Sequence, residues 1–376
     1  MKIKVPALNL QAELREIRGE LVKRAQNVIS SGRYILGKEV EEFERRFSQF
    51  SGTKFAVGVA SGSDALLLSL MALGIGLGDE VITTPFSFIS TVTAVTRLGA
   101  KPVFADVEEE SFNLNPRFIQ KNMTKRTRAI LLVHLYGNPC KMDQILSIAK
   151  QFNLFVVEDC AQACGAIFDG KKVGSFGEFG AFSFYPSKTL GAAGDGGMIT
   201  TNDRELYEKA KSLRHHGSDA RDHSYRHKIV GINSRLDEVQ AAILNVKLKR
   251  LAKWNEARRK AAAKYHDLFS TSNLPMVQTP LEEIKGKSVY HQYTIRAPRR
   301  NELLKYLHER GISAAVYYPL PLHLQPCFRY LNCQEGDFPV AEQLSQEVLS
   351  LPLYPQIKPQ EQKLVVQEIK KFFLRS

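Results

Sequence analysis

Residues 55–107 read FAVGVASGSDALLLSLMALGIGLGDEVITTPFSFISTVTAVTRLGAKPVFADV, and this stretch predicts the fold of the chain. Short apolar runs at 55–60, 80–86 and 101–107 are typical of buried strands, and the segments between them carry apolar residues at helical spacing. Strands that read as continuous apolar runs and alternate with helices indicate a mostly parallel sheet covered on both faces. The stretch therefore predicts an α/β fold.

The same alternation continues toward residue 205. Further strands are expected at 129–137, 154–162, 180–188 and 197–203, with a helical pattern between the first two. Because ligands of such sheets bind at the carboxyl ends of the strands, the functional residues are expected in the turns that follow them.

The pattern changes after residue 235. Residues 236–269 form one helical pattern without Gly or Pro, and a helix of about 30 residues would run about 45 Å, enough to bridge two domains. Beyond it, strands are expected at 289–297 and 313–319, together with further helices. We therefore expect a large α/β domain at 1–250 and a smaller α+β domain at 251–376.

Composition excludes several classes of protein. The chain has 376 residues, of which 44% are hydrophobic and 24% charged, so disorder is not expected. Its longest apolar stretch, 65–78, is shorter than the ~20 residues of a membrane span, and the charged N-terminus does not resemble a secretory signal. We expect a cytoplasmic protein without membrane contact. The five cysteines lack zinc-site spacing and are expected to be free thiols rather than metal ligands.

The net charge of +13 is concentrated between residues 241 and 310, a stretch that contains 15 Lys and Arg but only 6 Asp and Glu. Such a surplus attracts nucleic-acid phosphates or an anionic metabolite, or it forms a solvated helix face without a partner. No zinc finger, RNP-like signature or basic region with heptads accompanies it. Nucleic acid is therefore the weaker reading, and no nucleic-acid partner is expected.

Three turns after expected strands carry residues suited to chemistry. Gly62 and Ser63 lie between a strand and a helix, where free amides favour a phosphate, although a plain helix N-cap is the commoner explanation of such a cluster on its own. Glu158 and Asp159 end a buried strand, where an acid needs a cationic partner or backbone capping. Lys188 follows another strand and precedes four glycines, a setting that suits a Schiff-base lysine. Pyridoxal phosphate (PLP) requires these three parts together.

On these residues the chain resembles the DegT/DnrJ/EryC1/StrS family of PLP-dependent nucleotide-sugar aminotransferases. The resemblance covers nearly the whole chain. It is carried by the segments SGSDAL (61–66), GDEVITTPFSFIST (78–91), PVFADV (102–107), HLYGNPCKMDQI (134–145), VVEDCAQACGA (156–166), SFYPSKTLGAAGDGG (183–197), GINSRLDEVQAA (231–242) and YYPLPLHLQP (317–326). It implies the type I, aspartate-aminotransferase-like fold.

The resemblance also implies residue roles. Lys188 would be the Schiff-base lysine and proton carrier, Asp159 would pair with the pyridinium nitrogen, Gln162 would lie near the ring hydroxyl, and Phe88 would stack on the ring. The phosphate would be held by Gly62, Ser63 and Ser183, and by Asn233 from a second subunit, which makes a homodimer part of each site. The chain departs from the family at three positions. Thr189 stands where the family often has Asn, Cys140 where a smaller residue is usual, and Tyr317 where related sugar 3-aminotransferases often have His.

The implied reaction is the transfer of an amino group from L-glutamate to a nucleotide-linked keto sugar. The segment at 317–326 resembles 3-keto more than 4-keto aminotransferases. Candidate substrate contacts are Tyr185, Arg214, Tyr318 and His323, although both tyrosines also suit a core or an interface. Two alternatives stay open: a PLP-dependent sugar dehydratase, which typically has His in place of Lys188, and a non-enzymatic regulatory or sensor protein, which would be expected to lose cofactor residues.

Overall fold

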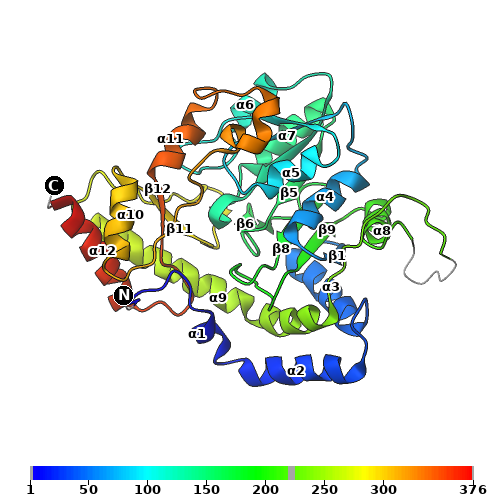
Figure 1. Cartoon of the computed structure of the whole chain (residues 1–376), viewed down its shortest axis with the longest axis horizontal. Helices are drawn as coiled ribbons and strands as arrows, with labels where there is room; N and C mark the ends of the chain where they lie inside the picture. Colours follow the sequence, from blue (N-terminus) through cyan, green and yellow to red (C-terminus); the bar gives the residue numbers. More distant parts are fainter. Residues whose placement is uncertain (1–2, 219–224, 375–376) are drawn as a thin grey trace.

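A seven-stranded sheet forms the centre of the protein, in the strand order β1-β9-β8-β5-β4-β2-β3. The computed structural model describes residues 3–218 and 225–374 (Figure 1). Strands β8, β5, β4, β2 and β3 are parallel, and β9 is antiparallel to both of its neighbours, so the expected mostly parallel α/β sheet is confirmed. Its strands are β1 (Phe55–Val59), β2 (Glu80–Thr83), β3 (Lys101–Phe104), β4 (Thr127–Val133), β5 (Phe155–Asp159), β8 (Phe179–Ser183) and β9 (Gly197–Thr201).

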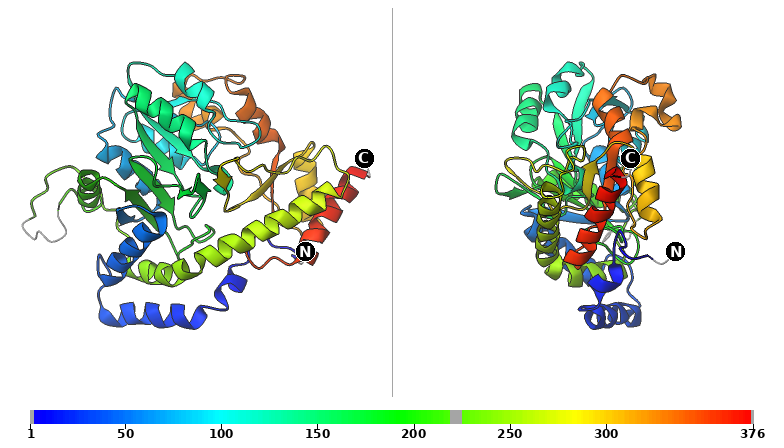
Figure 2. Two further views of the ribbon diagram at one scale, coloured as in Figure 1. Left: turned by 180° about the vertical axis from the view of Figure 1, so that it is seen from behind. Right: turned by 90° about the vertical axis from the view of Figure 1, so that its left-hand side faces the viewer.

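Helices cover both faces of this sheet, because its side chains are apolar on both sides. On one face the helices are α4 (Gly62–Ala72), α5 (Ser90–Thr96) and α8 (Arg204–Leu213). On the other they are α3 (Lys38–Ser51), α6 (Pro116–Lys121), α7 (Met142–Phe152) and the first half of α9 (Glu238–Ser270). The 33-residue α9 begins within two residues of the expected start and runs past the sheet toward the C-terminal elements (Figures 1 and 2).

A second core lies at the far end of α9. Tyr265 and Phe269 of α9 pack there with Ile295, Ile369 and Val5, so the N-terminal segment joins the C-terminal elements. This part contains α10 (Arg300–His308), α11 (Pro339–Glu347), α12 (Pro359–Leu374) and the antiparallel pair β11 (Tyr293–Arg296) and β12 (Val348–Leu351). The division expected at residue 250 falls inside α9, which continues through it.

The remaining elements are short or peripheral. Helices α1 (Leu10–Leu14) and α2 (Arg18–Ser31) run beside α9 (Figure 2). A small sheet is formed by β6 (Ile167–Phe168), β7 (Lys171–Lys172) and β10 (Gly286–Lys287), and the 3-10 turns are η1 (Leu135–Gly137), η2 (Leu322–Leu324) and η3 (Pro326–Leu331). Within the described ranges, no helix combines the length and the apolar character needed to cross a bilayer.

The strand expected at 313–319 is wrong. Only Ala315 forms a bridge there, with Ser350, and the chain then leaves the ladder toward Pro319. Tyr317 and Tyr318 pack instead against the cluster around Phe86. The apolar run is therefore a connection whose aromatic side chains fill the space between the main sheet and α11.

Candidate active site

The turns after β1, β5 and β8 lie at one edge of the main sheet. Strand β1 runs in the same direction as β8, because both pair antiparallel with β9, and β8 is parallel to β5. A Cβ atom on Gly62 would lie 2.6 Å from the Cβ of Ser183, and one on Gly197 would lie 2.3 Å from the carbonyl oxygen of Ser61. Glycine at these positions lets the turn after β1 meet the end of β8.

Helix α4 begins in this contact. The Ser61 hydroxyl accepts a hydrogen bond from the Asp64 amide at 3.1 Å, which caps the helix. The Ser63 and Ser90 hydroxyls lie 2.6 Å apart. The first amides of a helix have no partner within the helix, and its dipole favours an anion there. Gly62, Ser63 and Ser183 thus form a small polar cradle at a helix N-terminus, which suits a phosphate.

Asp159 ends β5 as a buried carboxylate. One oxygen accepts a hydrogen bond from the Thr91 hydroxyl at 3.0 Å, and the other accepts one from the Ala161 amide at 3.1 Å. Burial raises the pKa of Asp159, while these two donors and the nearby charge of Lys188 lower it. Each oxygen keeps a second lone pair, so the carboxylate suits a cationic nitrogen.

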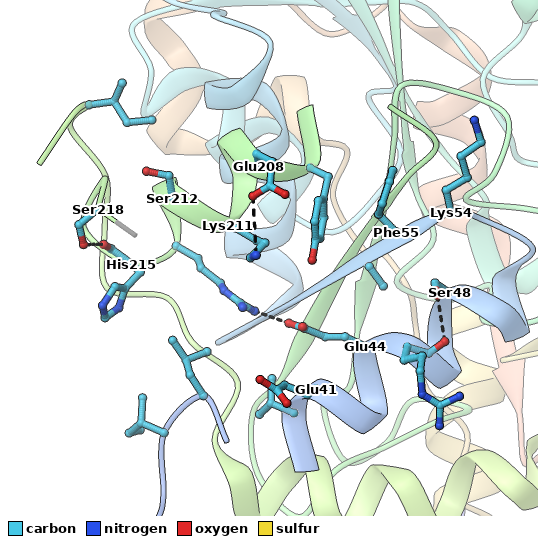
Figure 3. A pocket seen from close by; sticks show the side chains of 18 of the residues that line it. Glu41, Glu44, Ser48, Lys54, Phe55, Glu208, Lys211, Ser212, His215 and Ser218 are labelled. Carbon is cyan, nitrogen blue, oxygen red and sulfur yellow. Dashed lines mark hydrogen bonds and ion pairs between the residues drawn. The ribbon is translucent and has the colours of Figure 1, made fainter. Parts of the chain in front are cut away.

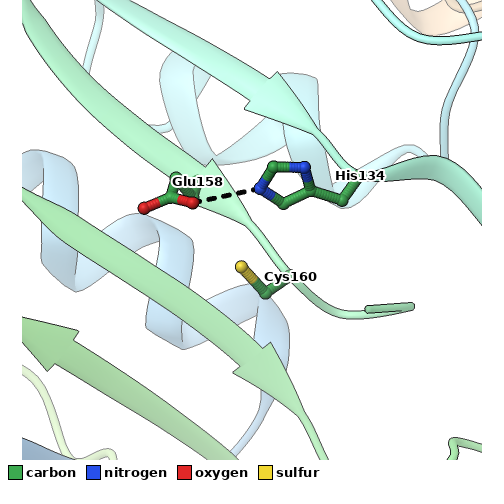
Figure 4. Close-up of side chains that lie close together, drawn as sticks. All are labelled: His134, Glu158 and Cys160. Atoms are coloured by element: carbon green, nitrogen blue, oxygen red, sulfur yellow. Dashed lines mark hydrogen bonds and ion pairs between the residues drawn. The ribbon is translucent and has the colours of Figure 1, made fainter. Parts of the chain in front are cut away.

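Glu158, its neighbour in β5, points to the opposite face of the strand, and each of its carboxylate oxygens already accepts two hydrogen bonds from the protein. Its carboxylate accepts hydrogen bonds from the amides of Gly174, Phe176 and Gly177 at 2.7–2.9 Å. It also accepts one from His134 Nε2 at 3.1 Å (Figure 4). The proton of His134 lies on Nε2, because Nδ1 accepts a hydrogen bond from the Cys140 amide. The structure therefore separates two acids that the sequence presented together.

His134, Glu158 and Cys160 place one donor atom each within 4.8 Å of one another (Figure 4). Hydrogen bonds already occupy the imidazole and the carboxylate, and burial raises the pKa of the Cys160 thiol well above its ordinary value. A metal ion would have to displace these bonds and remove that proton. The cluster therefore serves as a structural network beneath β5.

Lys188 lies in a tight loop after β8. Its amide donates to the carbonyl of Tyr185 at 2.8 Å, and the Ala192 amide donates back to the carbonyl of Phe184 at 2.7 Å. Burial lowers the pKa of the Lys188 ammonium, and the charge of Asp159 opposes this shift. A lowered pKa increases the fraction of the neutral amine, which is the form that attacks an aldehyde.

Gln162, in the turn after β5, connects the η1 turn to the C-terminal part. Its side-chain oxygen accepts a hydrogen bond from the Tyr136 amide at 2.7 Å, and its nitrogen donates to the Tyr318 hydroxyl at 3.1 Å. The Tyr318 ring lies 6.2 Å from the ring of Phe88, which is 54% exposed. Phe88, Gln162 and Tyr318 are thus brought together.

A family model described as the DegT/DnrJ/EryC1/StrS aminotransferase family matches residues 15–370. The chain belongs to this family. The expected type I aminotransferase fold is confirmed, because a solved structure described as a DegT DnrJ EryC1 StrS aminotransferase from Brucella abortus matches with a TM-score of 0.91 at 36% identity, over 97% of this chain and 98% of its own.

Relatives and solved structures of this family match over nearly their full length. The "Pleiotropic regulatory protein" of Geobacillus stearothermophilus is 47% identical over 98% of each chain. The "dTDP-3-amino-3,4,6-trideoxy-alpha-D-glucose transaminase" of Streptomyces venezuelae is 43% identical and covers 94% of this chain and 92% of its own. The crystal structure of S. venezuelae DesV in complex with a ketimine intermediate has a TM-score of 0.95 at 42% identity and 99% coverage of both chains.

The cofactor of the aminotransferase is PLP, and the residues present fit it. The cradle at Gly62 and Ser183 excludes a side chain and offers a helix N-terminus to a phosphate. Asp159 has free acceptor capacity, and Lys188 is an amine with a lowered pKa in the charge field of Asp159. These three features are the parts that the cofactor requires.

The expected substrate contacts of the aminotransferase lie in different surroundings. Tyr185 is 55% exposed and lies in the loop that carries Lys188. His323 is buried between Phe104 and Phe338, and its Nε2 lies 3.0 Å from the carboxylate of Glu342. Burial lowers the pKa of His323. His323 is thus already paired within the chain.

Arg214 is buried on the outer side of β1. Its guanidinium is ion-paired with Glu44 and donates to the carbonyl of Gly58 at 2.7 Å. It lines a cavity of about 910 Å³ between α3, α8 and β1 (Figure 3). Neither Lys188 nor Asp159 lines this cavity. The Arg214 guanidinium is therefore paired in this cavity, whose lining includes neither Lys188 nor Asp159.

Asn233 is exposed on the segment before α9. Its backbone forms a bridge with His215, and the next residue, Ser234, donates to the Asp64 carboxylate at 2.8 Å. This bond ties the segment to the start of α4, and Asn233 itself is exposed.

Sequence reasoning missed Thr91 and Tyr136. Thr91 directly contacts Asp159, and Tyr136 orients the Gln162 amide through its own backbone. The stretch 78–91, which carries part of the resemblance, contains Thr91, but a threonine at the start of a helix reads first as a local cap. A backbone amide carries no signal in the sequence.

Proposed function

We propose that this aminotransferase moves the amino group of L-glutamate to the keto group of a nucleotide-linked sugar, with C3 favoured over C4. The observation that carries the proposal is the complete set at one sheet edge: a buried carboxylate, an amine with a lowered pKa and a helix N-terminal cradle. The name of the S. venezuelae transaminase, a 3-amino sugar enzyme, supports the choice of C3.

Lys188 and Asp159 carry the chemistry in this proposal. The cofactor, when bound, supplies an aldehyde for Lys188 and a ring that withdraws electrons from the amino substrate. Asp159 keeps the ring nitrogen protonated, because its ionised form is stabilised by Thr91 and by the Ala161 amide. The Lys188 Nζ would take the proton from the substrate carbon that bears the amino group, as general base, and would later give that proton up as general acid.

Other residues of the proposal bind and orient. Gly62, Ser63 and Ser183 hold the phosphate, Phe88 covers the ring and Gln162 faces the ring hydroxyl. For the sugar nucleotide we propose Tyr185 and Tyr318 as contacts, because the one is exposed beside Lys188 and the other is bonded to Gln162. Arg214 and His323 would first have to leave Glu44 and Glu342. Two charges on the diphosphate suit the net charge of +13.

The active unit in this proposal is a homodimer. Asn233 is exposed at a position fixed next to α4, and we propose that it reaches the phosphate bound by the partner copy. A cytoplasmic location belongs to the same proposal and is tested by cell fractionation.

The test is incubation of the purified protein with L-glutamate and a panel of 3-keto and 4-keto sugars linked to dTDP or UDP. We expect one amino sugar and an equal amount of 2-oxoglutarate, identified by mass. Borohydride reduction before digestion should fix the cofactor to the peptide that contains Lys188, and Lys188→Ala should give neither the label nor the product. A label on another lysine would contradict the assignment, and turnover of only the 4-keto substrates would contradict the preference for C3.

A regulatory role is the second candidate, because the relative from G. stearothermophilus is named a regulatory protein. A regulator that acts without catalysis would keep its effect in a Lys188→Ala variant. The retention of Lys188, Asp159 and the cradle favours the enzyme. It also favours transamination over dehydration of the sugar, because Lys188 occupies the position at which the sugar dehydratases of this family typically have His.

A further inference from the structure

Two side chains of α9 hold the loop that carries Lys188. Lys247 Nζ donates a hydrogen bond to the carbonyl of Gly191 at 2.6 Å. Gln240, two helical turns earlier on the same face, accepts one from the Ala193 amide at 2.9 Å. The loop that follows Lys188 is therefore bonded to α9 at two points.

The loop is also closed on itself around Lys188. The Ala192 amide donates to the carbonyl of Phe184 at 2.7 Å. A Cβ atom on Gly191 would lie 2.3 Å from the carbonyl oxygen of Pro186. A displacement of the Gly191 carbonyl therefore moves both ends of the short segment that contains Lys188.

Lys247 is a buried cation that depends on one counter-ion. Its side chain is 4% exposed, and Nζ lies 3.1 Å from the carboxylate of Glu13, whose side chain is equally buried. The ring of Trp254 lies 6.0 Å from Nζ. A buried ammonium without its carboxylate is strongly destabilising. The bond to Gly191 therefore requires Glu13.

Glu13 belongs to the N-terminal segment and reaches Lys247 because that segment packs on α9. Ile17 forms an apolar cluster with Val246 and Trp254, and Leu14 and Leu21 pack against it. Helices α1 and α2 run beside α9 in two views (Figures 1 and 2). Successive contacts thus join the N-terminal segment to the Lys188 loop: Glu13 pairs with Lys247, and Lys247 bonds to Gly191.

We propose that Glu13 and Lys247 are positioning residues for Lys188. Packing of the N-terminal segment places Glu13, Glu13 holds the Lys247 ammonium, and the ammonium fixes the Gly191 carbonyl and with it the loop. The inference rests on the proposed role of Lys188 as the lysine that binds the cofactor. It assigns to the N-terminal helix a part in cofactor capture, although this helix lies outside the cofactor residues.

The experiment compares Glu13→Gln, Lys247→Met and the double variant with an exposed pair. Lys249 and Glu20 form an ion pair at 2.7 Å between α9 and α2, with side chains 47% and 42% exposed. Lys249→Met and Glu20→Gln are therefore matched controls. Full-length protein freed of cofactor receives PLP, and the absorbance band of the Schiff base reports the rate of capture. The pH at which this band changes in the loaded protein reports the surroundings of Lys188.

We expect Lys247→Met and Glu13→Gln each to slow capture about tenfold, the factor for losing one hydrogen bond to a charged group, and to shift the pH midpoint of the band. The double variant should be impaired by less than the product of the two effects, because it leaves no unpaired charge. Emission of Trp254, the only tryptophan of the chain, should change in the same variants. The variants of the exposed pair should leave the capture rate, the pH midpoint and the Trp254 emission unchanged.

Capture and pH midpoint at wild-type values in a folded double variant would overturn the proposal, as would equal effects from the exposed pair. If Lys247→Met does not fold, Glu13→Gln and the double variant decide in the same way. Borohydride labelling of the wild type comes first: a label absent from Lys188 refutes the proposed function itself, whereas a label on Lys188 with unaffected variants refutes only the role of Glu13 and Lys247.

Discussion

Gly62 lies so close to Ser183 that a side chain at position 62 would place its Cβ atom 2.6 Å from the Cβ atom of Ser183. The two residues belong to different turns, one after β1 and the other at the end of β8. Their contact brings a helix N-terminus to the loop that carries Lys188. The cradle is therefore set by backbone approach as well as by the hydroxyl groups around it.

Gly62→Ala should weaken cofactor binding and lower the free energy of unfolding by about 1–3 kcal/mol, the usual cost of overpacking. Gly19→Ala is the matched control, because Gly19 also lies in the first turn of a helix and a Cβ atom there meets nothing within 4 Å. The control should be neutral or slightly stabilising. Cofactor titration and urea unfolding measure both effects, and equal behaviour of the two variants would contradict the cradle.

Asp159→Asn should keep the shape of the site and lose most turnover, by about 100-fold or more, because an amide does not hold the ring nitrogen protonated. The same substitution should stabilise the cofactor-free protein at neutral pH. Burial raises the pKa of Asp159, so ionisation of this carboxyl costs stability as pH rises from its unfolded value of about 3.9. Unfolding at several pH values should show that the variant is more stable than the wild type near pH 7, and that this difference in stability disappears below about pH 3.9, the unfolded pKa.

Glu158→Gln should lower the free energy of unfolding by about 2–4 kcal/mol, because the buried carboxylate accepts hydrogen bonds from three amides and from His134. Glu16→Gln serves as control, since Glu16 is 71% exposed in its pair with Lys253 and should change stability by less than about 0.5 kcal/mol. Thermal unfolding compares the two, and a neutral Glu158→Gln would show that the network is dispensable.

Thiol reagents should label the native protein at Cys327 first, because this cysteine is exposed. Cys140, Cys160 and Cys164 should react only after unfolding, since all three are buried and burial raises the pKa of each thiol. Mass mapping after timed labelling gives the order. Early modification of Cys160 in folded protein would show that the network around β5 opens.

Asn233 can be tested by complementation between two inactive proteins. Lys188→Ala is mixed with a variant that carries a bulky or charged residue at Asn233, and subunit exchange is confirmed separately. About half of the dimers should be hybrids with one intact site, so activity should approach a quarter of the wild-type value for two-fold symmetry. No recovery would mean that Asn233 serves its own chain or no site.

The sequence predicted the central fold because its strands are continuous apolar runs with glycine-rich turns. It also placed Asp159 and Lys188 at the sheet edge where the structure has them. Patterns of this kind report which positions are buried, so the C-terminal ends of β5 and β8 followed from local sequence. The run at 313–319 has the same apolar pattern, and its aromatic side chains pack without entering a ladder.

The pattern did not distinguish buried charges from solvated ones. Lys247 and Arg258 belong to the basic stretch 241–310, where a solvated helix face was among the expected readings, yet both are buried. Their burial depends on partners far along the chain, Glu13 for Lys247 and the Leu353 carbonyl for Arg258. Burial lowers the pKa of Arg258 to about 10. Long-range pairing of this type leaves no periodicity to detect.

Glu158 and Asp159 are neighbours in β5 and lie on opposite faces of the strand, which makes β5 sensitive to insertions and deletions. The two acids occupy opposite faces, with Glu158 bonded beneath the strand and Asp159 bonded to Thr91 above it. Because successive residues of a strand alternate between faces, the gain or loss of one codon before Glu158 within β5 would exchange the faces on which the two acids lie. Both carboxylates would survive in the chain, and neither would meet its partners. A single-residue insertion or deletion before Glu158 is therefore expected to disrupt the contacts of both acids even though both are retained.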